Sequence, residues 1–295
     1  MMLKKQIVKM YNEDNNIENN NTFMEEENIS VDINKLKQVY SQAKKLMLEI
    51  MSYSNSEKMI TIEIAPYGYT NSKRSKKDGI TYFGYEFPQS GAKSEVDFIM
   101  TNKDNYFYDE AFIGRHFMIK FNPDDLNYYI KDLGKGYGTF IKIQDWTEIK
   151  NNLLLNIGEN YLVFSYGEDE ESEDEKNLND LEIKKNYDSL NIKIFSFNTQ
   201  QKDYDISSSN CPVTIGRSSD NTIFIDDDML SRNHCSIDFK NGKFYIQDGY
   251  AKIGLKEERI KKSTNGSWIY AYDEMPIIDK MIFKANHNLF ICNLV

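Results

Sequence analysis

The chain has 295 residues, enough for about two domains, and 40% of them are apolar, so it can build packed cores. Its formal net charge of −10 argues against non-specific nucleic-acid binding, which depends on many lysine and arginine contacts to phosphates. No apolar stretch reaches the 18 residues that would predict a membrane span, and the opening residues do not resemble a secretory signal. The three cysteines, Cys211, Cys235 and Cys292, are scattered and lack metal-ligand spacing. A reducing, intracellular setting, cytoplasmic or nuclear, fits them best.

The first 55 residues predict two segments. Residues 1–30 are rich in Asn and Glu and predict a disordered acidic tail. Residues 31–55 predict an amphipathic helix, because apolar residues recur at spacings of three and four: Ile33, Leu36, Tyr40, Ala43, Met47 and Ile50. We expect this helix to dock on a neighbouring domain; coiled-coil pairing is the alternative, although the pattern covers fewer than three heptads.

The rest of the chain predicts β-strands. The segments "ITIEI" (60–64) and "NIKIFSF" (191–197) alternate apolar and polar residues, as do residues 235–239 and 244–247. Asn241-Gly242 separates the last two runs, and both residues tolerate the positive φ of a tight hairpin turn. Repeated short strands of this kind indicate a β-sandwich.

The strand-rich region consists of two similar halves, 59–166 and 188–295. "RHFMIKF" (115–121) aligns with "NHCSIDF" (233–239), and "LNIGENYLVF" (155–164) aligns with "FKANHNLFIC" (283–292). Residues 167–187 lie between the halves and include seven acids among the eight residues 168–175, which predicts an extended acidic linker. The sequence thus predicts a mainly β protein in which one sandwich fold is used twice.

Three short motifs in the second half suit an anion. They are Gly216-Arg217, Ser231-Arg232-x-His234 and Thr264-Asn265-Gly266, all at the ends of predicted strands. Arg217 offers a planar fork of donors for two oxygens of a phosphate dianion, and the hydroxyl of Ser231 can donate to a third. Arg232 can add a second positive charge at the rim.

These motifs, in this order, resemble the forkhead-associated (FHA) domain, and the resemblance covers the whole second half. It implies a β-sandwich whose apical loops bind phosphothreonine peptides. It also implies that Asn265 grips the peptide backbone, with Thr264 beside it, and that His234 braces the loop without touching phosphate. Gly216 and Gly266 are expected to allow close approach of the backbone.

The first half differs from this pattern at the phosphate positions. Gly84-Tyr85 aligns with Gly216-Arg217, Ile113 and Gly114 align with Ser231 and Arg232, and Tyr137 aligns with Asn265. We therefore expect a degenerate FHA-like sandwich that does not bind phosphate, although Arg115 leaves open another route to a ligand.

Two loops have alternative interpretations. "LGKGYGTF" (133–140) resembles a nucleotide-binding loop, but strand-like segments on both sides predict a strand-to-strand turn. Asp226, Asp227 and Asp228 could suggest a cation site, yet carboxylates that start turns are the commoner explanation. Residues 249–263 hold five cations and two acids, a net charge of +3. This loop is either a positive lip that attracts an anionic partner or a solvated loop.

The sequence predicts no enzyme, cofactor or metal site, because three histidines and three cysteines supply no nucleophile with its base. The function predicted is an adaptor whose second FHA domain binds a threonine-phosphorylated protein. The first domain would be a structural or phosphate-independent protein-binding module. The alternative is a structural scaffold within a large, cytoskeletal or ciliary assembly. Neither nucleic acid nor membrane is an expected partner.

Overall fold

The computed structural model describes residues 41–52, 55–72, 74, 78–86, 96–100, 113–166, 188–196, 200–251 and 260–295. These residues form β-strands, loops and one short 3-10 helix, η3 (Ser208–Asn210), and they include no α-helix. No helix in this part of the chain could cross a membrane. The predicted mainly β class is confirmed. The predicted tail 1–30 and linker 167–187 lie outside the described residues.

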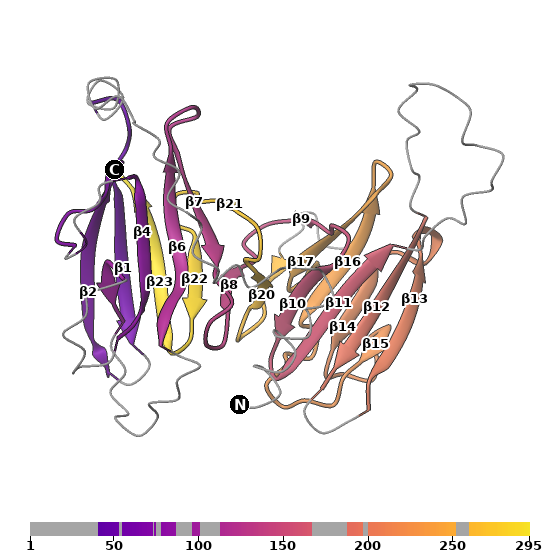
Figure 1. Cartoon of the computed structure of the whole chain (residues 1–295). Coiled ribbons are helices and arrows are strands. Elements are labelled where there is room, and N and C mark those ends of the chain that lie inside the picture. The colour runs from indigo at the N-terminus through magenta and orange to yellow at the C-terminus, as the bar shows by residue number, and fades with distance from the viewer. Residues whose placement is uncertain are drawn as a thin grey trace, which may run out of the picture. The chain divides into compact units, whose positions relative to one another are not determined.

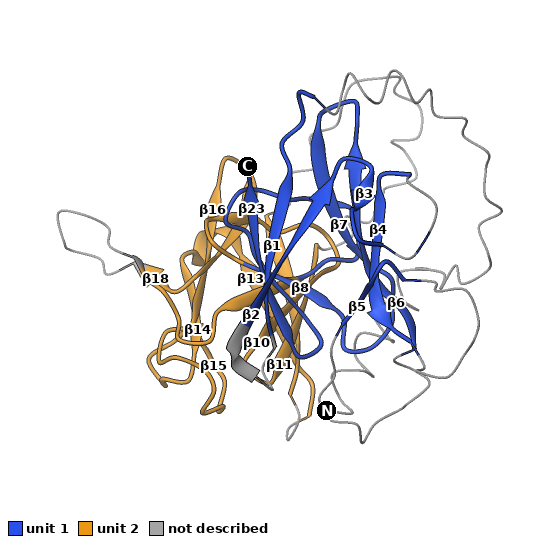
Figure 2. Ribbon diagram, turned by 90° about the vertical axis from the view of Figure 1, so that its left-hand side faces the viewer, with its two compact units in different colours: residues 1–142, 270–295 blue, residues 143–269 orange. Residues whose placement is uncertain are grey.

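The chain forms two compact units, which Figure 2 distinguishes by colour. Unit 1 comprises residues 1–142 and 270–295, and unit 2 comprises residues 143–269. These boundaries differ from the domains expected from the sequence, 59–166 and 188–295. Unit 2 is therefore a continuous segment, whereas unit 1 is built from two segments of the chain.

Unit 1 consists of two sheets (Figure 1). The first has the order β8-β22-β23-β1-β2-β3 and the second β21-β7-β6-β4-β5. Both sheets are antiparallel except for the parallel pair β4–β5. The strands are β1 (Leu46–Ser52), β2 (Asn55–Ala65), β3 (Gly68–Tyr69), β4 (Ile80–Tyr85), β5 (Phe98–Ile99), β6 (Gly114–Asn122), β7 (Asn127–Asp132), β8 (Thr139–Lys142), β21 (Met275–Pro276), β22 (Ile282–Ala285) and β23 (Asn288–Leu294).

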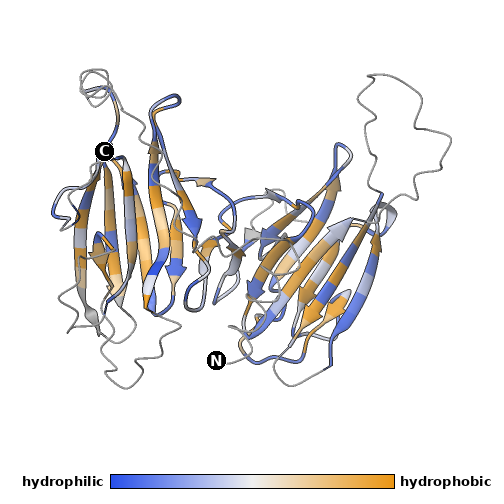
Figure 3. Ribbon diagram, in the orientation of Figure 1, coloured by the Kyte–Doolittle hydropathy of each residue, from blue (hydrophilic) through white to orange (hydrophobic). Residues whose placement is uncertain are grey.

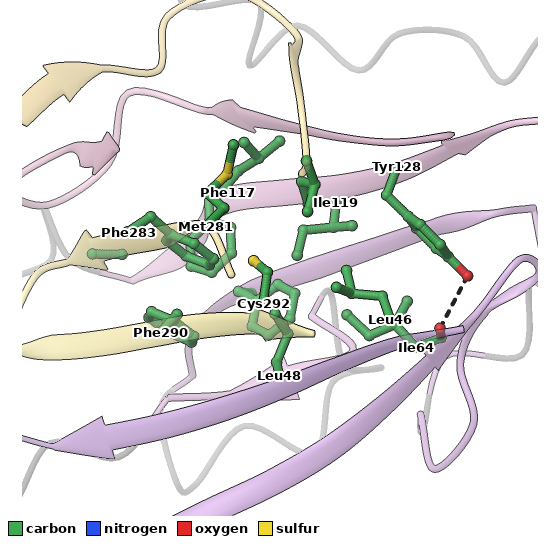
Figure 4. Packing of buried hydrophobic residues seen from close by; sticks show 14 of the residues in the cluster. Leu46, Leu48, Ile64, Phe117, Ile119, Tyr128, Met281, Phe283, Phe290 and Cys292 are labelled. Atoms are coloured by element: carbon green, nitrogen blue, oxygen red, sulfur yellow. Dashed lines mark hydrogen bonds between the residues drawn. The ribbon is translucent and has the colours of Figure 1, made fainter. Parts of the chain in front are cut away.

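The core of unit 1 lies between these sheets (Figure 4). Phe283 and Phe290 stack with ring centroids 4.5 Å apart, and both rings pack edge-on against Phe117. Phe283 and Phe290 come from the C-terminal hairpin β22–β23, while Phe117 comes from β6. All three side chains are fully buried, so the C-terminal hairpin is an integral part of this core.

Unit 2 also has two sheets, with orders β13-β12-β11-β10-β20 and β15-β14-β16-β17-β9, and a small ribbon β18–β19. Its only parallel contact among the described strands is β14–β15. The strands are β9 (Thr147–Glu148), β10 (Leu153–Ile157), β11 (Asn160–Tyr166), β12 (Ser189–Phe195), β13 (Lys202–Ser207), β14 (Val213–Gly216), β15 (Ile223–Phe224), β16 (Cys235–Lys240), β17 (Lys243–Asp248), β18 (Tyr250–Ala251), β19 (Ile260–Lys261) and β20 (Ser267–Tyr270), the last ending at the unit boundary.

The predicted alternation along the strands is present in the structure. Figure 3 shows hydrophobic and hydrophilic residues alternating along many of them. Residues 60–64 lie in β2, residues 191–195 in β12, and residues 235–239 in β16. Asn241 and Gly242 form the two-residue turn between β16 and β17, with φ of 53° and 78°. The segment "LGKGYGTF" joins β7 to β8, which confirms the predicted strand-to-strand turn.

Each half of the sequence gives its last hairpin to the other unit. Strands β10 and β11 pair with β20 and β12 in unit 2, whereas β22 and β23 pair with β8 and β1 in unit 1. The two hairpins have the similar sequences "LNIGENYLVF" and "FKANHNLFIC" and turns of the same length. Because both present the same apolar pattern, the sequence alone does not say which sandwich each completes. This explains why the expected boundaries differ from the observed ones.

The helix predicted over residues 31–55 is wrong for its C-terminal part. Leu46–Ser52 forms strand β1, and Asn55 begins strand β2. Leu46, Leu48 and Ile50 alternate with more exposed neighbours and are at most 5% exposed, so period two decides the structure here. Pairing with β2 on one side and β23 on the other outweighs the helical spacing of Met47 and Ile50. The earlier positions Ile33, Leu36 and Tyr40 lie outside the described residues.

Candidate anion-binding site

The loops that follow β14 and precede β16 are held together by backbone hydrogen bonds. The N–H of Arg217 donates to the carbonyl of Ser231, and the N–H of Ser218 donates to the carbonyl of Arg232, each at 3.1 Å. A Cβ on Gly216 would lie 2.3 Å from the Arg232 carbonyl oxygen, so only glycine permits this approach. The structure thus brings Arg217 beside Ser231 and Arg232.

His234 connects this region to the third motif, Thr264-Asn265-Gly266. It is fully buried, and its Nδ1 accepts a hydrogen bond of 3.1 Å from the N–H of Ser231. Its Nε2 therefore carries the proton and donates to the carbonyl oxygen of Gly266, also at 3.1 Å. The imidazole thus ties the loop of Ser231 to the turn that carries Thr264 and Asn265.

Burial lowers the pKa of His234. The ring of His234 in the folded protein therefore takes up a second proton, on Nδ1, at a lower pH than in the unfolded chain, where histidine titrates near about 6.5. The stability contributed by the neutral ring is complete above that value and is lost as the pH falls through the lowered pKa. We expect the unfolding free energy of the wild type to fall more between about pH 7.5 and about pH 5 than that of His234→Asn. Urea unfolding measures this without interference from titration of a phosphate ligand; parallel curves would contradict it.

Ser231 also contacts the third motif through its hydroxyl. The N–H of Thr264 donates to Ser231 Oγ at 3.0 Å, and the two hydroxyl oxygens lie 3.4 Å apart. Asn265 donates from Nδ2 to the backbone carbonyl of Met229 at 2.7 Å. The backbone carbonyl of Asn265 accepts from the indole N–H of Trp268. Thr264 and Asn265 are exposed and Ser231 is half-buried, so polar groups of both loops face solvent.

The site carries several exposed cationic side chains. Arg217 and Arg232 are exposed, and within the described part of the chain neither guanidinium makes an ion pair or a hydrogen bond. Lys261 and Lys262 are exposed next to the third motif, and Lys262 donates to the carbonyl of Gln144. Residues 252–259 of the predicted positive lip lie outside the described residues. Exposed guanidiniums with no partner among the described residues, close to the hydroxyls of Ser231 and Thr264, are well suited to a polyvalent anion.

Two residues that support the site could not be recognised from the sequence. Asn221, which is 7% exposed, donates from Nδ2 to the carbonyls of Ser218 and Arg232 and so ties the two arginine loops together. Asp248, which is 1% exposed, accepts from the N–H and hydroxyl of Ser263 and from the hydroxyl of Ser267. The sequence signal for Asp248 was weak, because an acid at the end of a strand commonly starts a turn.

Replacing Asp248 should therefore destabilise the buried hydrogen bonds that support the site. In Asp248→Ala three buried donors lose their acceptor, and we expect the unfolding free energy to fall by about 2–4 kcal/mol. Asp248→Asn keeps one acceptor oxygen and should lose less. Urea unfolding of the two variants beside wild type measures the difference, and an Asp248→Ala protein as stable as wild type would refute the assignment.

The positions of unit 1 that the sequence alignment pairs with the three motifs have different surroundings. Gly84 lies opposite Ile99 in the parallel pair β4–β5, as Gly216 lies opposite Phe224 in the parallel pair β14–β15. Tyr85 follows it, is 9% exposed, and packs edge-on against His116. Asn286 donates to Nδ1 of His116 at 2.7 Å and accepts from the N–H of Tyr137 at 2.8 Å. Burial raises the pKa of Tyr85, which remains a neutral phenol.

Comparison with known proteins gives a match to a segment that lies mostly in unit 2. Residues 213–276 match the family model of the FHA domain, and this range contains every site residue predicted from the sequence. FHA domains are non-enzymatic modules that in general bind phosphopeptides. The chain matches no curated protein. Strands β10 to β13, which form most of one sheet of unit 2, lie outside the matched range.

Proposed function

We propose that the protein is an adaptor that binds threonine-phosphorylated proteins through unit 2. The observation that carries this proposal is a pair of exposed arginines, Arg217 and Arg232, whose guanidiniums have no partner among the described residues. Backbone hydrogen bonds hold their loops together beside Ser231. A phosphothreonine brings a charge of about −1.5 to −2 and three acceptor oxygens. Arg217 would take two oxygens, Ser231 the third, and Arg232 would add charge at the rim.

Thr264 and Asn265 would hold the peptide next to the phosphate. Asn265 is exposed and its Nδ2 already donates to Met229, which orients the carboxamide. A carboxamide both donates and accepts, so it matches the alternating groups of a peptide backbone. Thr264 is supported by Ser231 Oγ, and this contact couples the phosphate and peptide subsites.

We propose further that unit 1 is a second sandwich of the same kind that does not bind phosphate. The parallel pairs β4–β5 and β14–β15 occupy equivalent places, and the sequences around His116 and His234 align. Tyr85 stands where Arg217 would be, and Asn286 occupies the region beside His116. These features favour the second candidate for this unit, a structural or phosphate-independent scaffold.

A degenerate phosphothreonine peptide library tests the phosphate-dependent function. The full chain should select phosphorylated over unphosphorylated peptides, and should prefer phosphothreonine to phosphoserine if the threonine methyl fills an apolar niche. Pull-down from lysate with and without phosphatase treatment separates the two candidates. Partners that remain equally bound after dephosphorylation would favour the scaffold and count against the adaptor.

A further inference from the structure

Asp227 joins the turn of the β10–β11 hairpin to the loop that precedes the anion site. Its Oδ2 accepts hydrogen bonds from the N–H of Glu159 at 3.0 Å and from Nδ2 of Asn160 at 2.7 Å. Its Oδ1 accepts from the N–H of Met229 at 2.7 Å. One carboxylate therefore holds two segments that lie 67 positions or more apart in the sequence.

The contact continues from Asp227 to the predicted peptide-binding residue. The carbonyl of Asp227 accepts from the N–H of Leu230, which closes a short turn immediately before Ser231. Within that turn the carbonyl of Met229 accepts from Nδ2 of Asn265 at 2.7 Å. The carboxamide of Asn265 is thus oriented by a turn whose shape depends on Asp227.

The hairpin turn provides a fixed point for these contacts. Asn160 is 2% exposed, and Asn156 donates to the carbonyls of both Gly158 and Asn160. Gly158 has φ of +54°, and a Cβ there would lie 2.5 Å from Oδ2 of Asp227. The turn therefore approaches Asp227 as closely as a glycine allows.

We propose that Asp227 is a positioning residue of the phosphopeptide site, which fixes the carboxamide of Asn265 to the β10–β11 hairpin. This inference rests on the proposed function. It makes peptide recognition depend on residues 158–160, which lie outside the range matched by the FHA family. It also gives the middle member of the triplet Asp226-Asp227-Asp228 a role distinct from its neighbours.

The test compares three alanine variants of the full chain with equal change in charge. Asp226 and Asp228 are exposed and accept no side-chain hydrogen bond in the described part of the chain, so Asp226→Ala and Asp228→Ala are matched controls. Removing a negative charge near an anion site should leave phosphopeptide affinity unchanged or raise it slightly. Asp227→Ala should instead lower it about five- to thirtyfold, because Asn265 loses its orientation. The probe is a fluorescent phosphothreonine peptide selected from the degenerate library, and binding is followed by anisotropy.

A double-mutant cycle separates positioning from general support. In an Asn265→Ala background, Asp227→Ala should cost little further affinity, whereas in an Arg217→Ala background its effect should persist. Asp227→Asn retains an acceptor for Met229 and should recover part of the binding. The side-chain amide resonances of Asn265 in a ¹⁵N–¹H spectrum of Asp227→Asn should also shift, which reports on orientation without ligand.

The outcomes distinguish the inference from the function on which it rests. If Arg217→Ala binds the peptide at least about tenfold more weakly than the wild type, but Asp227→Ala binds like Asp226→Ala, only the positioning role is refuted. Equal losses from Asp227→Ala with and without Asn265 would likewise overturn it. If the wild type binds no phosphothreonine peptide, the proposed function and this inference fall together.

Discussion

A fragment of residues 188–295 is expected to remain unfolded. It contains every residue predicted for the anion site but lacks β10 and β11, which pair with β12 and β20 in unit 2. Without them β12 loses its contact with β11, and β20 loses its contact with β10. The fragment would retain β22 and β23, whose observed partners β8 and β1 belong to unit 1 and would be missing.

The size of this effect follows from burial. Five side chains of the missing hairpin are fully buried: Leu154, Leu155, Ile157, Leu162 and Phe164. Burying each contributes roughly 1.5–3 kcal/mol, so their removal costs about 7–15 kcal/mol. This is comparable with the whole stability of a typical domain, about 5–15 kcal/mol. Far-UV circular dichroism and urea unfolding should show no cooperative transition for 188–295.

The matched control is a fragment of residues 143–269, which contains unit 2 in full. It should fold cooperatively and bind the selected phosphothreonine peptide with the affinity of the full chain. If 188–295 also folds and binds, the hairpin β22–β23 must be able to replace β10–β11. That result would contradict the exchange of hairpins between the halves of the sequence.

Arg217→Ala is expected to weaken phosphopeptide binding by tenfold to over a hundredfold. The guanidinium is exposed and has no protein partner among the described residues, so its removal leaves the fold intact and takes two charge-assisted hydrogen bonds from the ligand. Such bonds contribute about 1.5–3 kcal/mol, which gives this range of affinity. Titration of wild type and variant with the selected peptide measures the loss.

Two further substitutions show whether geometry or charge is responsible. Arg217→Lys keeps the charge but not the planar fork, and should bind more weakly than wild type and more tightly than Arg217→Ala. Arg115→Ala removes an exposed arginine of unit 1, whose guanidinium lies 4.0 Å from the centre of the Tyr82 ring, and should leave binding unchanged. Equal affinities of wild type and Arg217→Ala would remove Arg217 from the site.

Much of the fold could be predicted because strands with one buried face have a visible period. Cys235 and Ile237 point inward between more polar neighbours, and Asn241-Gly242 supplies the turn chemistry. The helix prediction for residues 46–52 is wrong because two patterns overlap there. Met47 and Ile50 fit a helical spacing, while Leu46, Leu48 and Ile50 fit a strand. Only pairing with the neighbouring strands decides between these patterns. Strand β2 follows directly in the sequence, but β23 lies near the C-terminus.

In the candidate site, too, residues with a distinctive type and position can be predicted, whereas residues that act through contacts with distant loops cannot. Arg217, Ser231 and Asn265 could be predicted because guanidinium, hydroxyl and carboxamide groups at strand ends are unusual enough to suggest a shared ligand. Asp227 and Asn221 could not, because their roles depend on backbone groups of other loops. A short acidic or amide side chain in a turn has the same appearance whether it starts that turn or holds a distant one.

The continuous course of unit 2 has a consequence for biosynthesis. Residues 143–269 leave the ribosome before residues 270–295, so unit 2 can close while unit 1 still lacks β21, β22 and β23. Unit 1 must keep the exposed sides of β1 and β8 open until β22 and β23 arrive. We therefore expect a nonsense mutation shortly after position 269 to spare the proposed phosphopeptide site. The same mutation should destroy unit 1 and expose an aggregation-prone sheet edge.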